Sequence, residues 1–357
     1  MTPGLVRLAL RRTVRDVKHV EAVRPRRAGG RVREVYRQLE RDFGMLAPPI
    51  ALHSPSPPVL AAAWLLLRES LVAAGVSSRA DREVVAAAVS AANSCPYCAE
   101  VHAMAIGALG DPGTAAALEA GKPGEIADPG ARRLAGWARG AGPLPPATPA
   151  GAAAEFTAVA TAFHYLNRVV AVFLGDSPVP ARVPASARGR VKAVLGRFLR
   201  PGQAPPPGLA LALLPATGAD GPDWAEPGST LADAFARARV AVEAAGERVL
   251  PPRVRDLVRR ELKAWDGRPP GLGRSWAEGP LAELPAAERP AARLALLVAK
   301  AAYQVDDDLV ADLVRSDGLD DRGLVELVSW AAHAAAEELG SRLSLRPRGE
   351  DASRERG

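Results

Sequence analysis

The chain is poor in cysteine, in aromatic residues and in long apolar runs. Two cysteines in 357 residues exclude the set of bridges that holds small secreted proteins together. Aromatic residues make up 4% of the sequence, whereas alanine, leucine, valine and arginine dominate, which favours closely packed helices over β-sandwiches. The apolar runs VLAAAWLLL and RLALLVAKAA are too short to cross a bilayer, so we expect no integral membrane segment.

The N-terminal residues do not predict a secretory signal, because their apolar stretch GLVRLALRRTV is interrupted by arginine. Two closely spaced cysteines can be kept reduced in the cytoplasm, where we expect the protein to reside. The length predicts two domains, at roughly 150 residues for each.

Positive charge is concentrated in the first residues of the chain. The net charge is +6, but residues 1–35 alone carry +7, so the remainder sums to −1. We expect a basic N-terminal arm at 1–30, either a solvated extension or a strap over a neighbouring subunit. No aromatic alternation or nucleic-acid motif accompanies it, so nucleic-acid binding is not expected.

Apolar residues recur at helical spacing through most of the chain and predict an all-α protein. In the first half, capping and turn residues place helices at 31–46, 58–74, 79–93, 95–109, 113–120, 128–140 and 150–175. Clusters of proline and glycine mark the loops, and the best candidate for an inter-domain linker is 177–204.

The two halves repeat each other weakly. PVLAAAWLLLRESLVAAG at 58–75 matches STLADAFARARVAVEAAG at 229–246, and 160–175 matches 329–344. Continuing this register places Asp266 and Pro269 at the positions of the two cysteines. The second half is therefore predicted to repeat the scaffold without its chemistry.

The cysteines, Cys95 and Cys98, form a CxxC pair in the stretch NSCPYCAEVH. Random placement would give this spacing in under about 1% of cases. Ser94 and Pro96 predict that the pair opens a helix, where the partial positive charge favours a thiolate. At about 100° per residue, both sulfurs and His102 fall on one helical face.

Two other interpretations of the pair are possible. CPYC occurs in glutaredoxins, but that fold needs a preceding β-strand, and the preceding DREVVAAAVSAANS has a helical composition. Zinc is the second alternative for two cysteines and a histidine, but Glu83 would be no more than a fourth ligand, and no second CxxC is present. A redox dithiol is the favoured interpretation, with no metal.

The wider pattern is a glutamate, eleven residues, then Cys-x-x-Cys-x-x-x-His, made here by Glu83, Cys95, Cys98 and His102. This pattern resembles the alkylhydroperoxidase D-like family within the carboxymuconolactone decarboxylase superfamily. The resemblance implies two tandem helical domains, the catalytic one at 31–176 and a degenerate one at 205–345, with a disordered tail at 346–357. An active repeat followed by a degenerate one is also similar to the layout of sestrins.

The same resemblance implies a thiol peroxidase that reduces organic hydroperoxides. Cys98 would attack the peroxide, Cys95 would close the disulfide, and Glu83 with His102 would relay the proton. The redox-active disulfide would be the sole cofactor, and a lipoyl or thioredoxin-like protein would reduce it again. Tyr97 stands where some members have an additional histidine, and homo-oligomerisation stays open.

Two alternatives of a different class remain. The chain could be a binding or regulatory protein with a redox switch, or a carboxymuconolactone decarboxylase-like enzyme, whose chemistry does not need the dithiol. Further polar residues could line the pocket, although structural roles are expected for all of them: His53, His164, Asn167 and Arg168. The large aromatic residues Trp64, Trp137 and Trp330 are expected in the core.

Overall fold

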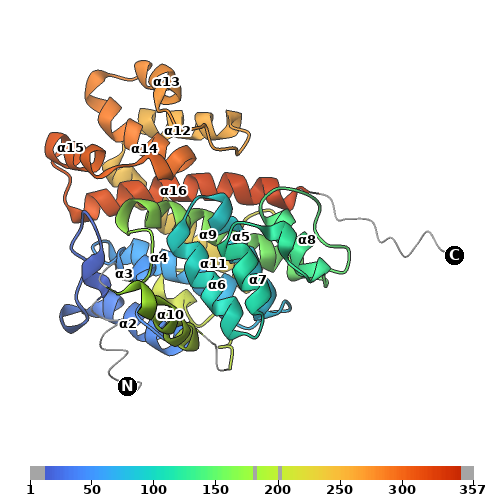
Figure 1. Ribbon diagram of the computed structural model, residues 1–357. Coiled ribbons are helices and arrows are strands. Elements are labelled where there is room, and N and C mark those ends of the chain that lie inside the picture. The colour runs from blue at the N-terminus through green and yellow to red at the C-terminus, as the bar shows by residue number, and fades with distance from the viewer. Residues whose placement is uncertain (1–12, 180–182, 200–202, 347–357) are drawn as a thin grey trace.

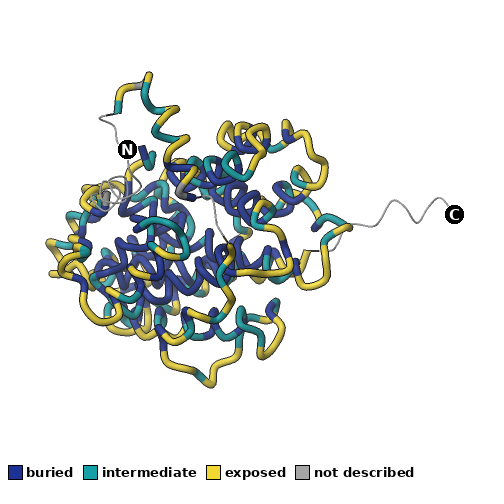
Figure 2. Tube along the Cα trace, turned by 90° about the horizontal axis from the view of Figure 1, so that it is seen from below, coloured by how far each residue is buried: buried dark blue, intermediate teal, exposed yellow. Residues whose placement is uncertain are grey.

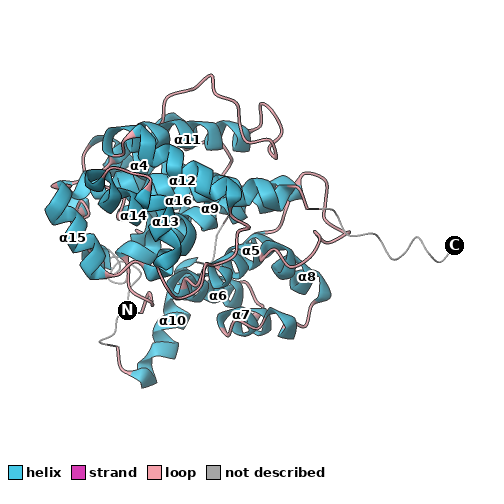
Figure 3. Cartoon of the chain, turned by 90° about the horizontal axis from the view of Figure 1, so that it is seen from above, coloured by secondary structure: helices cyan, strands magenta, loops and turns pink. Residues whose placement is uncertain are grey.

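The computed structural model describes residues 13–179, 183–199 and 203–346, and these residues form α-helices and loops without an extended strand (Figure 3). The helices of the first half are α2 (Gly30–Gln38), α3 (Pro48–Ala51), α4 (Pro57–Leu67), α5 (Arg79–Ala92), α6 (Pro96–Ala108), α7 (Pro112–Glu119), α8 (Pro129–Ala138) and α9 (Ala152–Phe173). The remaining helices are α10 (Ala185–Leu199), α11 (Thr230–Val249), α12 (Pro252–Ala264), α13 (Glu278–Ala282), α14 (Arg289–Ala301), α15 (Asp307–Asp317) and α16 (Asp321–Ser344). The predicted all-α class is confirmed.

The caps explain why the central helices begin where the sequence predicts. The side chain of Ser78 accepts a hydrogen bond from the backbone N–H of Asp81 at the start of α5, and Pro96 occupies the first turn of α6. Asp111 and Asp128 cap α7 and α8 in the same way. Each side chain satisfies a backbone donor that would otherwise lack a partner in the first turn.

Equivalent helices of the two halves pack against each other. Helix α9 lies along α16, and α4 lies along α11, so that both central pairs join one repeat to its counterpart. In Figure 1, α16 crosses the molecule, with α12 to α15 on one side and the helices of the first half on the other. One continuous buried core joins the halves and contains Trp64, Trp137 and Trp330, as expected (Figure 2). The chain is a tandem repeat with an internal interface.

The seam between α9 and α16 depends on a residue without a side chain. A Cβ atom placed on Gly340 would overlap the Oγ1 atom of Thr161 on α9 and crowd its Cβ. Gly246 on α11 lies equally close to the indole of Trp330 on α16. These two contacts allow the helix backbones to approach closely, as small residues do at helix crossings.

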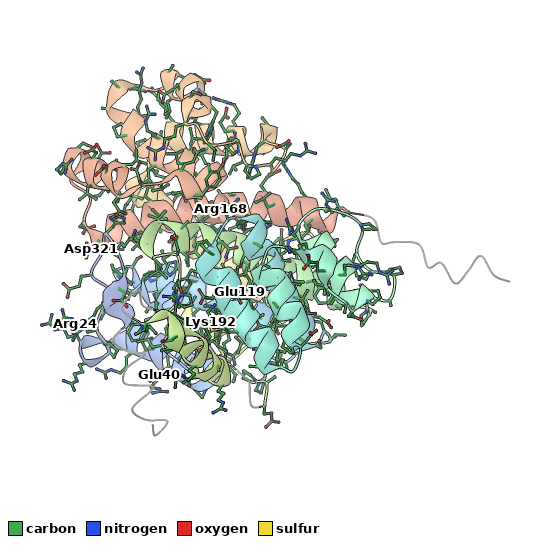
Figure 4. The ribbon with its side chains drawn as sticks, viewed as in Figure 1. Arg24, Glu40, Glu119, Arg168, Lys192 and Asp321 are labelled. Carbon is green, nitrogen blue, oxygen red and sulfur yellow. The ribbon has the colours of Figure 1, made fainter. Side chains whose placement is uncertain are left out.

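The segment expected to be a linker, 177–204, contains a helix that the sequence did not predict. Helix α10 packs against α6, and its Leu195 is buried with Val179 in a small apolar cluster. Lys192 of α10 forms ion pairs with Glu100 at 3.0 Å and with Glu119 at 2.6 Å (Figure 4). This connection therefore covers part of the first half.

The basic arm is described from residue 13 onward, and this part is not a solvated extension. The backbone N–H of Lys18 donates to the carbonyl of Phe173, and that of Glu21 donates to Asp321 of the second half. The hydroxyl of Tyr36 donates to the carbonyl of Val23. Residues 13–29 thus fasten the start of the chain to both repeats. Residues 1–12 and the tail at 347–357 lie outside the described residues.

Among the described helices, α9 alone is long and apolar enough to cross a membrane. Its most apolar stretch is 89% buried inside the protein, as in the core helix of a folded domain.

Candidate active site

The dithiol lies at the junction of α5 and α6. A tight turn joins these helices, and within it Ser94 adopts a left-handed conformation with φ of 54°. This conformation is unfavourable for a residue with a side chain, by an amount on the order of 1 kcal/mol. The turn brings Cys95 to the N-cap of α6, with its N–H bound to the carbonyl of Ser90, and places Cys98 in the first turn. The prediction that the pair opens a helix is confirmed, but Cys95 and not Ser94 is the N-cap, because Ser94 lies in the left-handed turn before it.

Glu83 and His102 meet as the spacing implied. Nδ1 of His102 on α6 lies 2.5 Å from Oε2 of Glu83 on α5, and both side chains are buried. The other carboxylate oxygen, Oε1, accepts a hydrogen bond from Nε of Arg79 at 2.7 Å. Burial opposes ionisation of Glu83, but the charges and hydrogen bonds of Arg79 and His102 outweigh it and lower its pKa to about 2.

This arrangement fixes the orientation of the imidazole. An ionised Glu83 makes Nδ1 of His102 the donor, so Nε2 is left to exchange a proton with another group. The edge-to-face contact with Phe163, at 4.4 Å between ring centroids, holds the ring from the other side. The pair can therefore serve as a proton relay with one free end.

Both cysteines are free thiols and both are buried, Cys95 at 2% and Cys98 at 4% exposure. Burial raises the pKa of the Cys98 thiol well above its ordinary value, and the adjacent Cys95 raises it further, while Asn167 lowers it. The expectation that the helix start favours a thiolate at this position was wrong, because desolvation is the larger effect. Cys98 must lose its proton as it reacts.

An apolar pocket of about 70 Å³ opens onto one of the two sulfurs. Cys98 and His102 line it, whereas Cys95 does not. Its walls are otherwise almost wholly apolar and include Phe43, Met45, Ile50, Leu67, Val101, Met104, Phe163, Leu166, Leu195 and Leu199. Helix α10 supplies the last two, so the unpredicted helix forms part of the pocket. The site presents a thiol and an imidazole to an apolar ligand.

A second polar network lies behind the dithiol. Asn167 on α9 donates to the hydroxyl of Ser90 and accepts from Nδ2 of Asn93, each at 3.0 Å. Asn93 also lies 3.1 Å from Nδ1 of His164. These bonds tie the residues before Cys95 to helix α9, so they hold the turn that carries the dithiol.

The remaining candidate residues divide between two settings. His53 does not line the pocket: its Nδ1 lies 3.1 Å from the carbonyl of Ile50 and its Nε2 lies 2.8 Å from the hydroxyl of Tyr165. Burial lowers its pKa to about 4, so it is a neutral structural residue. His164 and Arg168 face a different cavity, between the two halves. Tyr97 is buried, and its ring lines the apolar pocket.

Sequence reasoning missed two contributors to the site. Arg79 precedes Glu83 by four residues, a spacing at which oppositely charged side chains meet on a helix, so this ion pair was detectable. Asn93 gives no such signal, because its partners lie on α9, more than 70 residues away. Within the described residues, no group of three or more His, Cys, Asp or Glu side chains is arranged to hold a metal ion.

Comparison with known proteins agrees with this geometry. Residues 58–124, from α4 past the CxxC pair, match the carboxymuconolactone decarboxylase family. A protein of Mycobacterium tuberculosis named alkyl hydroperoxide reductase is 39% identical over 330 residues, which cover 91% of this chain and 94% of that protein. The chain belongs to the alkylhydroperoxidase D-like family.

The match extends over both halves of this alkylhydroperoxidase D-like protein, since 91% of a 357-residue chain cannot fit within one repeat. The tandem layout is therefore shared with the mycobacterial relative. No solved structure matches the chain. The family supports a peroxidase-like oxidoreductase in general terms, although the wider family also includes decarboxylases.

Proposed function

We propose that the protein is a thiol peroxidase that reduces organic hydroperoxides through Cys98 and Cys95. The observation that carries the proposal is the pocket, because Cys98 and His102 line the same apolar cavity. An alkyl or aryl hydroperoxide places its carbon chain against these walls and its peroxide group at the sulfur. Hydrogen peroxide gains nothing from the apolar lining.

In the first step, Cys98 gives up its proton to Nε2 of His102 and its sulfur attacks the terminal peroxide oxygen. The S–O bond forms as the O–O bond breaks, and the alkoxide leaves with a proton returned by the imidazole. The products are an alcohol and a sulfenic acid on Cys98. The carboxylate of Glu83 stabilises the imidazolium that exists between the two proton transfers.

In the second step, the sulfur of Cys95 attacks the sulfur of the sulfenic acid. An S–S bond forms, the S–O bond breaks and water leaves, so the thiol pair has supplied two electrons. The buried position of Cys95, next to Cys98 but outside the pocket wall, suits this resolving role. An external dithiol must then return two electrons and two protons.

We assign that reduction to a lipoyl or thioredoxin-like protein, with the disulfide as the sole cofactor and with the cytoplasm as the compartment that keeps such donors reduced. These assignments follow from the family and from the chemistry of the pair.

The decisive experiment counts free thiols before and after one equivalent of cumene hydroperoxide. Loss of both thiols, formation of cumyl alcohol and recovery of both thiols with dithiothreitol are expected. A Cys98→Ser variant is the matched control and must lose the reaction. Retained thiols in the wild-type protein, or turnover by Cys98→Ser, would refute the proposal.

A further inference from the structure

A second cavity, of about 480 Å³, lies where the two repeats meet. From the first repeat it is lined by the residues that end α5, by the residues that end α8, and by His164 and Arg168 of α9. From the second repeat it is lined by 265–269, by the ends of α14 and α16 and by Tyr303. The first of these segments occupies the positions that correspond to the dithiol in the predicted repeat.

Positive charge dominates the wall of this cavity. Its described lining residues include one carboxylate, Asp266, and six cationic side chains: Arg139, Arg168, Arg268, Lys300, Arg342 and Arg346. The chain as a whole has 46 cationic and 40 acidic side chains, and outside the N-terminal segment it is nearly neutral. The cavity is therefore a local concentration of charge and does not reflect the average surface.

Half of these cations have acidic partners. Lys300 pairs with Glu261 at 3.1 Å, Arg342 pairs with Glu338 at 2.9 Å, and Arg268 lies 3.7 Å from its neighbour Asp266. Arg139, Arg168 and Arg346 form no ion pair with any carboxylate of the described residues.

Arg168 is the deepest of the three and is 6% exposed. It lies on α9 where that helix runs along α16 (Figure 4). Its Nε donates to the carbonyl of Ala299 at 2.9 Å and its Nη1 to that of His164 at 2.8 Å. Its Nη2 has no hydrogen-bond partner within the described part of the chain, and burial lowers its pKa to about 10.

Attraction to the C-terminal ends of helices explains the position of only some of these arginines. Several helices end at the cavity, and the partial negative charge of a helix C-terminus weakly attracts an exposed arginine. That effect is enough to explain Arg139 and Arg346, which lie at the ends of α8 and α16. It is too small to offset the desolvation of a buried guanidinium that has no counter-ion.

Arg139 and Arg346 also lie near each other, since Arg346 packs against Gly140. The cavity thus has two exposed guanidinium groups and a third, buried one, which can bind one anion from several sides. The planar guanidinium group suits the oxygen atoms of phosphate and carboxylate groups.

We propose that the cavity between the repeats binds a small dianionic ligand, of the phosphate or dicarboxylate class, with Arg168 at its floor and Arg139 and Arg346 at its rim. This site is separate from the apolar pocket, although Asn93 links the two: its Oδ1 lies 3.5 Å from Nη1 of Arg168, and its Nδ2 donates to Asn167 behind the dithiol.

The test is calorimetric titration of the full-length protein with inorganic phosphate and, separately, with malonate, in chloride buffers of constant ionic strength. Saturable binding of at least one probe is expected. Arg139→Gln and Arg346→Gln are exposed changes that leave the core intact, and each should weaken binding roughly tenfold, the loss expected for one charge-assisted hydrogen bond. Arg168→Gln should abolish binding.

Arg133→Gln is the matched control, because Arg133 is an exposed arginine of α8 that does not line the cavity. It should bind both probes as the wild-type protein does. Absence of saturable binding, or equal affinity in the two rim variants and the wild type, would overturn the proposal. Because the readout is binding, this result is independent of whether the dithiol reduces peroxides.

Discussion

Glu83 and His102 lie on different helices, 19 residues apart in the chain, and their side chains meet at 2.5 Å inside the repeat that carries the dithiol. The contact joins a carboxylate that stays ionised to an imidazole that lines the apolar pocket together with Cys98. In the proposed mechanism, this imidazole accepts the proton of the buried thiol.

Replacing Glu83 should therefore slow the first chemical step. In Glu83→Gln the imidazole loses its ionic partner, and we expect peroxide-driven oxidation of Cys98 to fall about a hundredfold, a typical contribution of positioned acid–base groups. Stopped-flow oxidation with cumene hydroperoxide measures this rate. Asp81→Asn is a suitable control, because Asp81 is an acid on the same helix that is only partly buried and accepts a hydrogen bond from Ser78. A similar loss in that variant would contradict the assigned relay.

Removing the resolving thiol should separate the two steps. In Cys95→Ser, one equivalent of hydroperoxide should still yield one equivalent of alcohol, with a sulfenic acid trapped on Cys98 by dimedone. Excess peroxide should then carry Cys98 on to the sulfinic acid, because no second thiol intercepts it. Mass spectrometry of the peptide detects both products. If Cys95→Ser failed to react at all, the roles of the two cysteines would have to be exchanged.

The reactivity of Cys98 should rise steeply with pH. Burial raises the pKa of its thiol above the ordinary 9.0, so the thiolate fraction must still be increasing at that pH. Alkylation by iodoacetamide in a Cys95→Ala variant isolates this thiol. The rate should keep rising beyond pH 9, whereas a plateau below pH 8 would show that the site stabilises the thiolate.

Acid should destabilise the fold through His53. Its pKa of about 4 in the folded protein lies below the ordinary 6.5. Between these two pH values, the unfolded chain binds a proton that the folded chain does not bind. This contribution to stability is complete above pH 6.5 and is lost as the pH falls toward 4, by about 3 kcal/mol in all. Urea unfolding of wild type and His53→Gln across this range should give curves that converge at low pH. Parallel curves would exclude His53 as the cause.

The seam between α9 and α16 should be sensitive to one methyl group. Gly340→Ala is expected to lower the free energy of unfolding by about 1–3 kcal/mol, because the added Cβ overlaps Thr161. Gly189→Ala on α10, where a Cβ meets nothing, should be neutral or slightly stabilising. Adding Thr161→Ala to Gly340→Ala should restore part of the loss; purely additive destabilisation would show that the overlap is not responsible.

The sequence predicted the parts of this fold that local chemistry determines. The starts of α5 and α6 follow from Ser78 and Pro96, and the meeting of Glu83 with His102 follows from the family spacing. Helix α10 escaped prediction because glycine and proline surround it. Its Leu195 contacts a distant part of the chain, and this contact can be seen only in the folded protein.

The ionisation of Cys98 could not be predicted correctly for a related reason. Position at a helix start is readable from the sequence, but the degree of burial is a property of the assembled core, and here it outweighs the helix charge. The cationic cavity is likewise invisible in the sequence, since Arg139, Arg168 and Arg346 come from three separate helices, α8, α9 and the end of α16.

Pairing α9 with α16 and α4 with α11 within one chain has a consequence for how the protein behaves at low abundance. An interface formed between separate subunits weakens on dilution, whereas one between covalently joined repeats keeps a constant effective concentration. The repeat that carries the dithiol therefore keeps its partner repeat at any expression level.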